Sequence, residues 1–267
     1  MRLRHYLDRV GVQAPPAHLP PSLETLQRLH RAHREAFLFE NLSIQTGGGV
    51  SVALEDIERK FLDEGRGGYC FEHNTLFGAV LRDLGFDVAA FLGRVRRGPP
   101  ERWARTHMVL RVEVDGAAWL ADVGFGGHSL FEPMPLQAGA ESHQIGLTYA
   151  LRRDDRLWVL SMRDASDTWT DLYEFSDEPQ TAGDVEVANH YTSTHPHSMF
   201  RRTLTIQRTT RAERTILRGD VLARYRDGRL EEERVDRARL QAVAREIFGV
   251  DLPETTFVFE TYQPVNT

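Results

Sequence analysis

The order of local patterns along the chain predicts an α+β protein in three parts. The chain has 267 residues, 41% of them hydrophobic and 27% charged, so it is long enough to bury a good core. Residues 1–85 carry helical spacing, residues from about 86 to 210 carry short strand-like runs, and the end is mixed. This succession is typical of the α+β class, and we set the parts at 1–85, 86–190 and 191–267.

Three helices are predicted in the first part. Ser22 follows a proline pair and can cap the first helix, the second follows Ser51, and Gly85 is suited to end the third. The apolar positions that define the three faces are Leu23, Leu26, Leu29 and Phe37, then Leu54, Ile57, Phe61 and Leu62, then Phe77, Val80, Leu81 and Leu84.

Short runs rich in Val, Leu and aromatic residues predict strands in a meander or small barrel after the third helix. These runs are FDVAAFLGRV, HMVLRVEV, AAWLADV, LTYALRR, RLWVLSM and TLTIQ. Residues 212–226 predict further strands. A helical stripe near residues 240–247 ends at Gly249.

Composition excludes several classes of protein and of site. A single cysteine excludes an internal disulfide and a Cys-rich zinc site, and a free thiol suits a reducing compartment. The charged start MRLRHYLDRV and the lack of a long apolar run lead us to expect a cytoplasmic protein without membrane contact. The net charge of −6 argues against general nucleic-acid binding. Lys60 is the lone lysine, so an anion site would use arginine, histidine or backbone N–H groups.

The lone cysteine, Cys70, lies at the predicted start of the third helix. A helix N-terminus favours thiolate over thiol and offers N–H groups to an oxyanion. The preceding Gly67-Gly68 lets the backbone take unusual torsions and lets a ligand approach closely. Cys70 also shares the buried face of its helix, so a small apolar filler is the alternative interpretation. A reactive cysteine needs a base.

A predicted hairpin, TH-MVLRVEV-DG-AAWLADV-GFGG, offers that base. Asp115-Gly116 is a strong signal for a two-residue turn, and with that turn Val109 faces Asp122. His107 is then a diagonal neighbour of Asp122 on the same face, within reach of an imidazole–carboxylate hydrogen bond. A single bulge would change this register. The alternative is a satisfied polar pair without chemistry.

Cysteine, histidine and aspartate in this order match a Cys-His-Asp triad, and the chain resembles the arylamine N-acetyltransferases over nearly its whole length. The segments that carry the resemblance are FENLSI at 39–44, RGGYCFE at 66–72 with Asn74, Thr106-His107, DVGFG at 122–126, and STHP at 193–196 with Ser198 and Phe200. As an ordered set, these motifs are specific to that family.

The resemblance implies a papain-like core made of a helical bundle, a β-barrel and an α/β lid. It implies a triad of Cys70, His107 and Asp122, with acetyl-coenzyme A as the donor and no metal. The implied chemistry is ping-pong transfer of the acetyl group through Cys70 to a small arylamine or hydrazine.

The resemblance also implies which residues line the apolar acceptor pocket. These are Phe39, Val95, Phe125 and Phe200, each of which has plain core packing as its alternative. Glycines after the second hairpin strand can present amides to the coenzyme pyrophosphate, and the alternative for them is a tight turn. These glycines are Gly124, Gly126 and Gly127.

Other polar residues carry separate expectations. Arg66 and Glu40 form either a buried pair that holds the Cys70 loop or two solvated charges. His73 stands where the resembled family more usually has an apolar residue, and we expect it at the edge of the cleft. His30 and His33 lie one helical turn apart, and we expect them on the surface.

A metal site is not expected at the remaining histidine group. The group comprises His190, His195 and His197, where Pro196 separates two members and no local carboxylate completes a ligand set. Two other functions remain open from the residues. One is a cysteine hydrolase or transglutaminase-like enzyme with the same triad, and the other is an inactive ligand-binding or scaffold protein.

Overall fold

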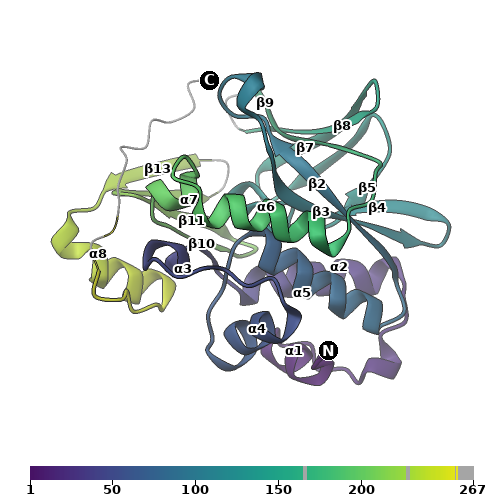
Figure 1. Ribbon diagram of the computed structural model, residues 1–267. Coiled ribbons are helices and arrows are strands. Elements are labelled where there is room, and N and C mark those ends of the chain that lie inside the picture. The colour runs from purple at the N-terminus through teal and green to yellow at the C-terminus, as the bar shows by residue number, and fades with distance from the viewer. Residues whose placement is uncertain (165–166, 227–228, 256, 258–267) are drawn as a thin grey trace.

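The computed structural model describes residues 1–164, 167–226, 229–255 and 257, and it confirms the predicted α+β class. In Figure 1 the helices α1, α2, α4 and α5 of the first part pack below an eight-stranded sheet, and a five-stranded sheet with α3 and α8 lies at the left. None of the helices in the described ranges combines the length and the apolar character needed to cross a bilayer.

The first part is helical, as predicted. Its elements are α1 (Leu3–Arg9), η1 (Pro16–His18), α2 (Leu23–Ala36), α3 (Leu42–Gln45), α4 (Leu54–Glu58), the π-helical turn η2 (Arg59–Asp63) and α5 (Cys70–Asp83). The hydroxyl of Ser22 caps α2 by accepting the Thr25 N–H at 3.3 Å. Gly85 follows α5 with a φ of +87°, the left-handed conformation that ends the helix.

The larger sheet is antiparallel, with the order β5-β4-β3-β2-β9-β8-β7-β6. Its strands are β2 (Asp87–Val95), β3 (Arg105–Val114), β4 (Ala117–Ala121), β5 (Met134–Pro135), β6 (Ala140–Gln144), β7 (Leu147–Asp154), β8 (Leu157–Arg163) and β9 (Trp169–Ser176). The two edges approach one another, since the Gln144 side chain of β6 accepts the Phe131 N–H at 2.7 Å, just before β5. The sheet is therefore a nearly closed barrel with its own apolar interior. The 3-10 turn η3 (Pro100–Arg102) precedes β3, and η4 (Gly126–His128) follows β4.

The smaller sheet has the order β1-β10-β11-β12-β13. Its strands are β1 (Phe39–Glu40), β10 (Thr205–Thr209), β11 (Glu213–Arg218), β12 (Val221–Arg226) and β13 (Arg229–Arg234), and it packs with α8 (Arg237–Val243) and η5 (Ala244–Phe248). The run TLTIQ was expected beside the barrel strands. That placement is wrong, because β10 pairs with β1 of the helical part, with Phe39 opposite Gln207.

Helix α6 (Ala182–Thr194) was not predicted, and it is followed by the short α7 (Met199–Arg202). Few apolar residues mark its buried face, since Val185 and Ala188 lie beside buried polar Asn189, Thr192 and Ser193. The helix continues across residue 190, where the second part of the chain was expected to end. The sequence did hold a local signal, because Thr181 and Asp184 form a capping box at its start.

Candidate active site

Cys70 is the first residue of α5 and is only 3% exposed. Glu72 Oε2 accepts the N–H of the N-cap residue Tyr69 at 3.1 Å, which satisfies an N–H group at the start of the helix. The Cys70 thiol donates to the Thr106 carbonyl oxygen, with 3.6 Å between sulfur and oxygen. The predicted helix-start position is confirmed, and the sulfur lies against the strand that carries His107.

The glycine pair before Cys70 allows close packing. A Cβ atom at Gly67 would lie 1.8 Å from the Leu38 carbonyl oxygen, and one at Gly68 would lie 2.3 Å from Glu72 Oε2. The expectation of unusual torsions is wrong, since neither glycine has a positive φ. Larger residues are excluded here because the loop runs directly against its neighbours.

Buried charges hold this loop in place. Glu40, only 1% exposed, accepts hydrogen bonds from Arg66 Nε at 3.0 Å and Nη2 at 2.8 Å, which confirms the pair, with a buried carboxylate and an Arg66 side chain that is 30% exposed. The lone lysine, Lys60, lies between two carboxylates, at 2.7 Å from Glu72 Oε1 and 3.9 Å from Glu40 Oε1. Burial raises the pKa of Glu72, and the positive charge of Lys60 opposes that rise.

Strands β3 and β4 form the predicted hairpin. Val114 pairs with Ala117, and the turn residues Asp115 and Gly116 have φ values of 52° and 78°. Pairing continues without a bulge until Asp122 follows the last residue of β4. His107 Nε2 lies 2.8 Å from Asp122 Oδ2, which confirms the predicted hydrogen bond.

Asp122 is fully buried and its carboxylate is well supplied with donors. Oδ1 accepts from Asn74 Nδ2 at 3.0 Å and from the Gly124 N–H at 2.8 Å. Burial alone would raise the pKa of this carboxyl, but His107 and the two N–H donors bring the pKa to about 2. Asp122 is therefore ionised, and it fixes the His107 tautomer with the proton on Nε2. Nδ1 is the nitrogen that Asp122 does not bind.

The Asp122 segment packs directly on the start of the Cys70 helix. A Cβ atom at Gly124 would lie 2.8 Å from Cys70 Cα and 2.7 Å from Asn74 Nδ2. Asn74, one helical turn after Cys70, bonds Asp122 through its side chain and also accepts the Val123 N–H at 3.2 Å. The sulfur, the imidazole and the carboxylate are thus brought into one small region by α5, β3 and the end of β4.

The electrostatic state of Cys70 differs from the expectation of a ready thiolate. Burial raises the pKa of the thiol, the backbone of Met108 and Phe71 partly offsets the rise, and the nearby Asp122 carboxylate adds to it. Burial outweighs the helix N-terminus, so deprotonation of the sulfur requires a base beside it.

Two of the expected acceptor-pocket residues lie on the His107 side of the site. The Phe125 ring stands edge-on to His107, with ring centroids 4.8 Å apart. Val95 pairs across the sheet with Tyr173, whose ring centroid lies 4.7 Å from that of His107. Their contact with an acceptor stays a prediction.

The other two expected pocket residues form a separate aromatic pair. The rings of Phe39 and Phe200 lie 6.0 Å apart, and Phe200 stands edge-on to Tyr69 at 5.2 Å. Since Tyr69 precedes Cys70, this pair flanks the nucleophile from the side of β1 and α7.

The glycines after β4 have partners inside the protein. The Gly124 N–H bonds Asp122, and the Gly127 N–H bonds Gln207 Oε1. A Cβ atom at Gly126, whose φ is +77°, would lie 2.6 Å from the same Gln207 oxygen. Two of the three amides expected to hold the coenzyme pyrophosphate are therefore occupied. The turn is tight and closely packed, and contact of these glycines with the coenzyme stays a prediction.

Two polar residues of α2 contact the Asp122 segment, and sequence reasoning missed both contacts. His30 was expected on the surface, but it is fully buried and its Nε2 accepts the Asp122 N–H at 3.2 Å. Arg34, 3% exposed, donates to the carbonyl oxygens of Val123 and Gly126 at 3.1 and 2.7 Å. The partners lie about ninety residues away in sequence, so no local pattern shows them.

His33 and His73 form a second missed contact, and the expectations for both were wrong. Neither residue has exposed surface, and His33 Nε2 lies 2.9 Å from His73 Nδ1. Tyr6 Oη bonds His33 Nδ1 at 3.0 Å, and His73 Nε2 bonds the Leu38 carbonyl oxygen at 3.0 Å. His73 thus lies on the side of the nucleophile helix α5 that packs against α2, and it is buried and not at a cleft edge.

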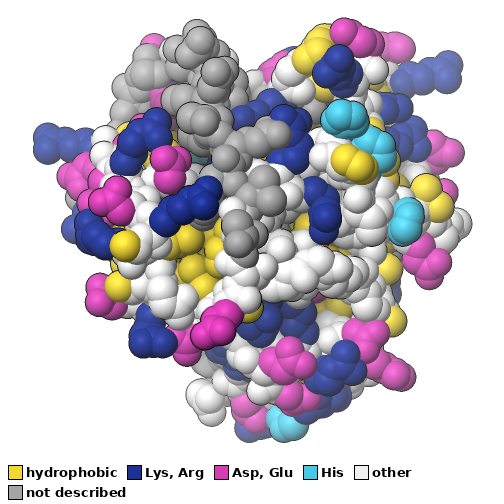
Figure 2. All heavy atoms as spheres, turned by 60° about the vertical axis from the view of Figure 1, so that its left-hand side comes forward, with side chains coloured by type: hydrophobic (Ala, Val, Ile, Leu, Met, Phe, Trp, Pro, Cys, Tyr) yellow, Lys and Arg dark blue, Asp and Glu magenta, His cyan; other side chains and the backbone are white. Residues whose placement is uncertain are grey.

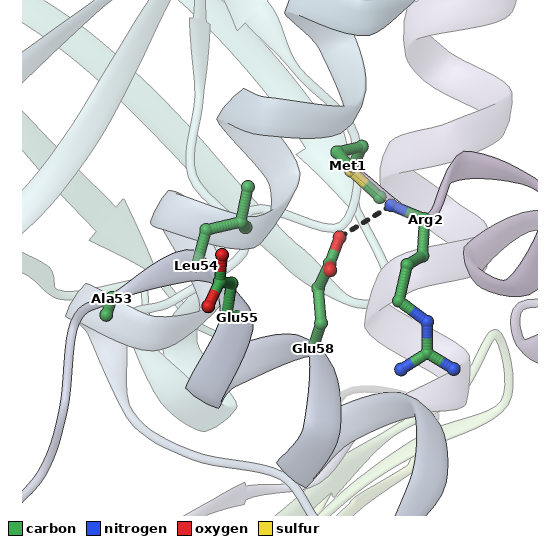
Figure 3. Close-up of a pocket in the computed structure, with 6 residues that line it drawn as sticks. All are labelled: Met1, Arg2, Ala53, Leu54, Glu55 and Glu58. Atoms are coloured by element: carbon green, nitrogen blue, oxygen red, sulfur yellow. Dashed lines mark hydrogen bonds between the residues drawn. The ribbon is translucent and has the colours of Figure 1, made fainter.

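Two cavities of the protein are lined by residues other than Cys70, His107 and Asp122. In the pocket of Figure 3, the Arg2 N–H donates to Glu58 Oε1 at 2.7 Å, and Glu55 lies on the same helix α4. A groove of about 790 Å³ runs between α5 and α6, past Thr75 and Met108.

On the face in Figure 2, cationic and anionic side chains are interspersed. Across the described ranges, no group of three or more His, Cys, Asp or Glu is arranged to hold a metal ion.

Comparison with known proteins places this geometry among acetyl-transfer enzymes. A family model described as N-acetyltransferase matches residues 22–257. The arylamine N-acetyltransferase of Mycolicibacterium smegmatis is 40% identical over 262 residues, covering 94% of this chain and 93% of the relative. That of Escherichia coli K12 is 33% identical over 261 residues, covering 96% and 92%.

Solved structures agree with the sequence relatives. A structure of the Mycobacterium smegmatis arylamine N-acetyltransferase matches with a TM-score of 0.88 at 39% identity, covering 94% of this chain and 93% of the other. The Mycobacterium marinum enzyme, solved in complex with CoA, matches with a TM-score of 0.87 at 35% identity, covering 92% of each chain.

Proposed function

The chain belongs to the arylamine N-acetyltransferase family, and from this premise we propose that it moves an acetyl group from acetyl-coenzyme A to an arylamine or hydrazine through an acetyl-Cys70 intermediate. The observation that carries the proposal is the 2.8 Å bond between His107 and an ionised Asp122, on a segment packed against Cys70. The bound CoA in the Mycobacterium marinum relative supports the choice of donor.

The first half-reaction forms the acetyl-enzyme. His107 Nδ1 takes the Cys70 proton as the sulfur attacks the thioester carbonyl, because burial makes the free thiolate unfavourable. Asp122 stabilises the imidazolium that forms. When the tetrahedral intermediate collapses, the bond to the coenzyme sulfur breaks and His107 returns the proton to that leaving thiolate.

The second half-reaction transfers the acetyl group to the amine. The amine nitrogen attacks the Cys70 thioester, His107 accepts a proton from that nitrogen, and the acylated amine leaves as the proton returns to the Cys70 sulfur. Phe39, Phe125 and Phe200 offer flat apolar walls suited to an aryl acceptor. The 3% exposure of Cys70 limits access by bulk water, which would hydrolyse the thioester.

We further propose that the three parts divide the work. Residues 1–85 supply the nucleophile, residues 86–190 supply His107 and Asp122, and residues 191–267 cover the site as a lid. Composition supports a cytoplasmic place of action.

Incubation with acetyl-coenzyme A alone, followed by intact mass measurement, tests the proposal. We expect the protein to gain one acetyl group, which an added arylamine removes with release of its N-acetyl product. Cys70→Ala should gain no acetyl group. An unchanged mass in the wild-type protein, with the fold intact by circular dichroism, would refute the proposal.

A further inference from the structure

We infer that Arg34 and His30, on helix α2, are positioning residues for Asp122: they hold the backbone of the segment Asp122–Gly126, and Arg34 places a buried positive charge near the Asp122 carboxylate. The inference rests on the proposed function in that it takes Asp122 as the acid of the triad. The resemblance to known enzymes assigned no part to either residue.

Arg34 joins all three parts of the molecule at one point. Its Nη1 donates to the Val123 carbonyl oxygen at 3.1 Å, and its Nη2 donates to the Gly126 carbonyl oxygen at 2.7 Å. Nη2 also donates to Thr209 Oγ1 of β10 at 2.8 Å. A planar guanidinium with these partners fixes the spacing between the two ends of the loop that follows Asp122.

The charge of Arg34 is buried without a direct ion pair to any described residue. Its hydrogen-bond partners are neutral oxygen atoms. Burial and the neighbouring Arg214 together lower the pKa of Arg34 to about 10, and the Asp122 carboxylate opposes both. The coupling is mutual, so the cation that Asp122 stabilises also favours the ionised carboxylate of Asp122.

His30 holds Asp122 from the other side. Its Nδ1 donates to the Phe131 carbonyl oxygen at 3.0 Å, which leaves Nε2 as the acceptor for the Asp122 N–H at 3.2 Å. Burial lowers the pKa of His30 to about 3, so the ring is neutral and keeps this tautomer at neutral pH. The main chain and the side chain of Asp122 are therefore fixed by different helices, α2 and α5.

Other ionisable groups face this pair from every neighbouring element. Those near Asp122 are His107 of β3, Cys70 of α5 and Tyr173 of β9, and those near Arg34 are Arg214 of β11, Tyr149 of β7, His30 and His33 of α2, and His73 of α5. Removal of the Arg34 cation therefore changes the electrostatic field at the ionised Asp122 carboxylate and at His107, its direct hydrogen-bond partner.

The test follows the rate of Cys70 alkylation by iodoacetamide across pH, beside acetylation by acetyl-coenzyme A. We expect Arg34→Met to slow both by about 100-fold, the scale of a displacement of about 1 Å at a reacting group. It should also move the acid limb of the alkylation profile to higher pH, because loss of a cation disfavours the thiolate. Arg34→Lys should restore the wild-type acid limb while restoring the rate only in part.

Arg31→Met is the matched control, since Arg31 lies on the same helix and forms a partly exposed ion pair with Glu132, 2.9 Å away. It should leave the rate and the pH profile unchanged. If Arg34→Met does not fold, His30→Leu and His30→Gln replace it: the Gln amide keeps an acceptor for the Asp122 N–H and should be the faster of the two.

A wild-type rate and acid limb in Arg34→Met would overturn the inference, whatever happens to its melting temperature. Equal rates in His30→Leu and His30→Gln would do the same if Arg34→Met fails to fold. The proposed function fails separately, because wild-type Cys70 would then react with iodoacetamide but take no acetyl group. The alkylation results for Arg34 would still decide the positioning role.

Discussion

Two buried polar clusters each include a residue of the nucleophile helix α5, and the clusters differ in charge. The ionic cluster comprises Asp122, His107 and Asn74, in which a carboxylate accepts bonds from an imidazole and an amide. The neutral cluster comprises Tyr6, His33 and His73, linked in a chain that ends on a backbone carbonyl group. Both are buried, yet only the first holds an anion.

The direction of each bond in the neutral cluster follows from its ends. The Leu38 carbonyl oxygen accepts only, so His73 Nε2 carries a proton and His73 Nδ1 accepts from His33 Nε2. His33 Nδ1 then accepts from the Tyr6 hydroxyl. Burial lowers the pKa of His73 to about 3 and lowers that of His33 well below its usual value. The comparison teaches that the partner, and not burial alone, decides whether a histidine can take part in proton transfer.

The largest expected effect comes from removing the charge of the ionic cluster. Asp122→Asn keeps the shape of the side chain but no longer fixes the His107 tautomer or stabilises the imidazolium. By analogy with the same change in the serine-protease triad, we expect the rate of Cys70 acetylation to fall by about 10⁴-fold. Single-turnover mass measurements check this. A drop no larger than that of a change in the neutral cluster would remove the distinction between the two.

A change in the neutral cluster should affect stability and not chemistry. His73→Leu leaves the His33 N–H without its acceptor and removes one donor from the Leu38 carbonyl oxygen. We expect the free energy of unfolding, from urea titration, to fall by about 1–3 kcal/mol. His73→Gln, which keeps a donor and an acceptor, is the matched control. Loss of acetylation on the scale of Asp122→Asn would show that the clusters are not separate.

The two clusters should lose their contributions to folding stability in different pH ranges. His73 of the neutral cluster, and likewise His30 outside both clusters, has a folded pKa of about 3 against an ordinary 6.5, so the unfolded chain binds more protons between these limits. Stability should therefore fall as the pH drops from 6.5 towards 3, by about 1.4 kcal/mol per pH unit for each such histidine. The folded pKa of Asp122, about 2, lies below its ordinary 3.8. Its contribution is lost only as the pH falls through that lower range.

Urea midpoints between pH 6.5 and 4.5 test this separation. His73→Leu should flatten the decline in stability, because one histidine no longer takes up a proton on unfolding. Asp122→Asn should leave the slope in this range unchanged. A steeper slope in the His73 variant would contradict the assignment of a neutral ring.

How well a contact could be predicted from the sequence depended on how far apart its two residues lie along the chain. The Asp115-Gly116 turn fixes the hairpin locally, so the bond between His107 and Asp122 could be predicted from spacing alone. The start of α5 at Cys70 was also visible, because the glycine pair and the apolar spacing lie within one segment.

The rest depended on contacts that no local pattern encodes. His33 and His73 are 40 residues apart, and Arg34 and Gly126 are 92 apart. Polar residues on a helix are ordinarily read as its solvent face, so the buried His30 and His33 of α2 were assigned to the surface. The same rule hid α6, whose buried face includes Asn189 and Ser193. Hydrophobic periodicity finds a core only where that core is apolar.

The smallest expected effect tests the far end of the neutral cluster. Tyr6→Phe removes the hydroxyl that donates to His33 Nδ1 and leaves the ring in place. The buried nitrogen then lacks a donor, so we expect the free energy of unfolding to fall by about 1 kcal/mol. Acetylation of Cys70 should be unchanged, because His107 keeps its bond to Asp122. Since His73 Nδ1 still accepts from His33 Nε2, nitrogen-15 NMR of the His33 ring should show the single wild-type tautomer in the variant. Mixed tautomers would mean that the Leu38 end of the chain is not enough to set the direction of its bonds.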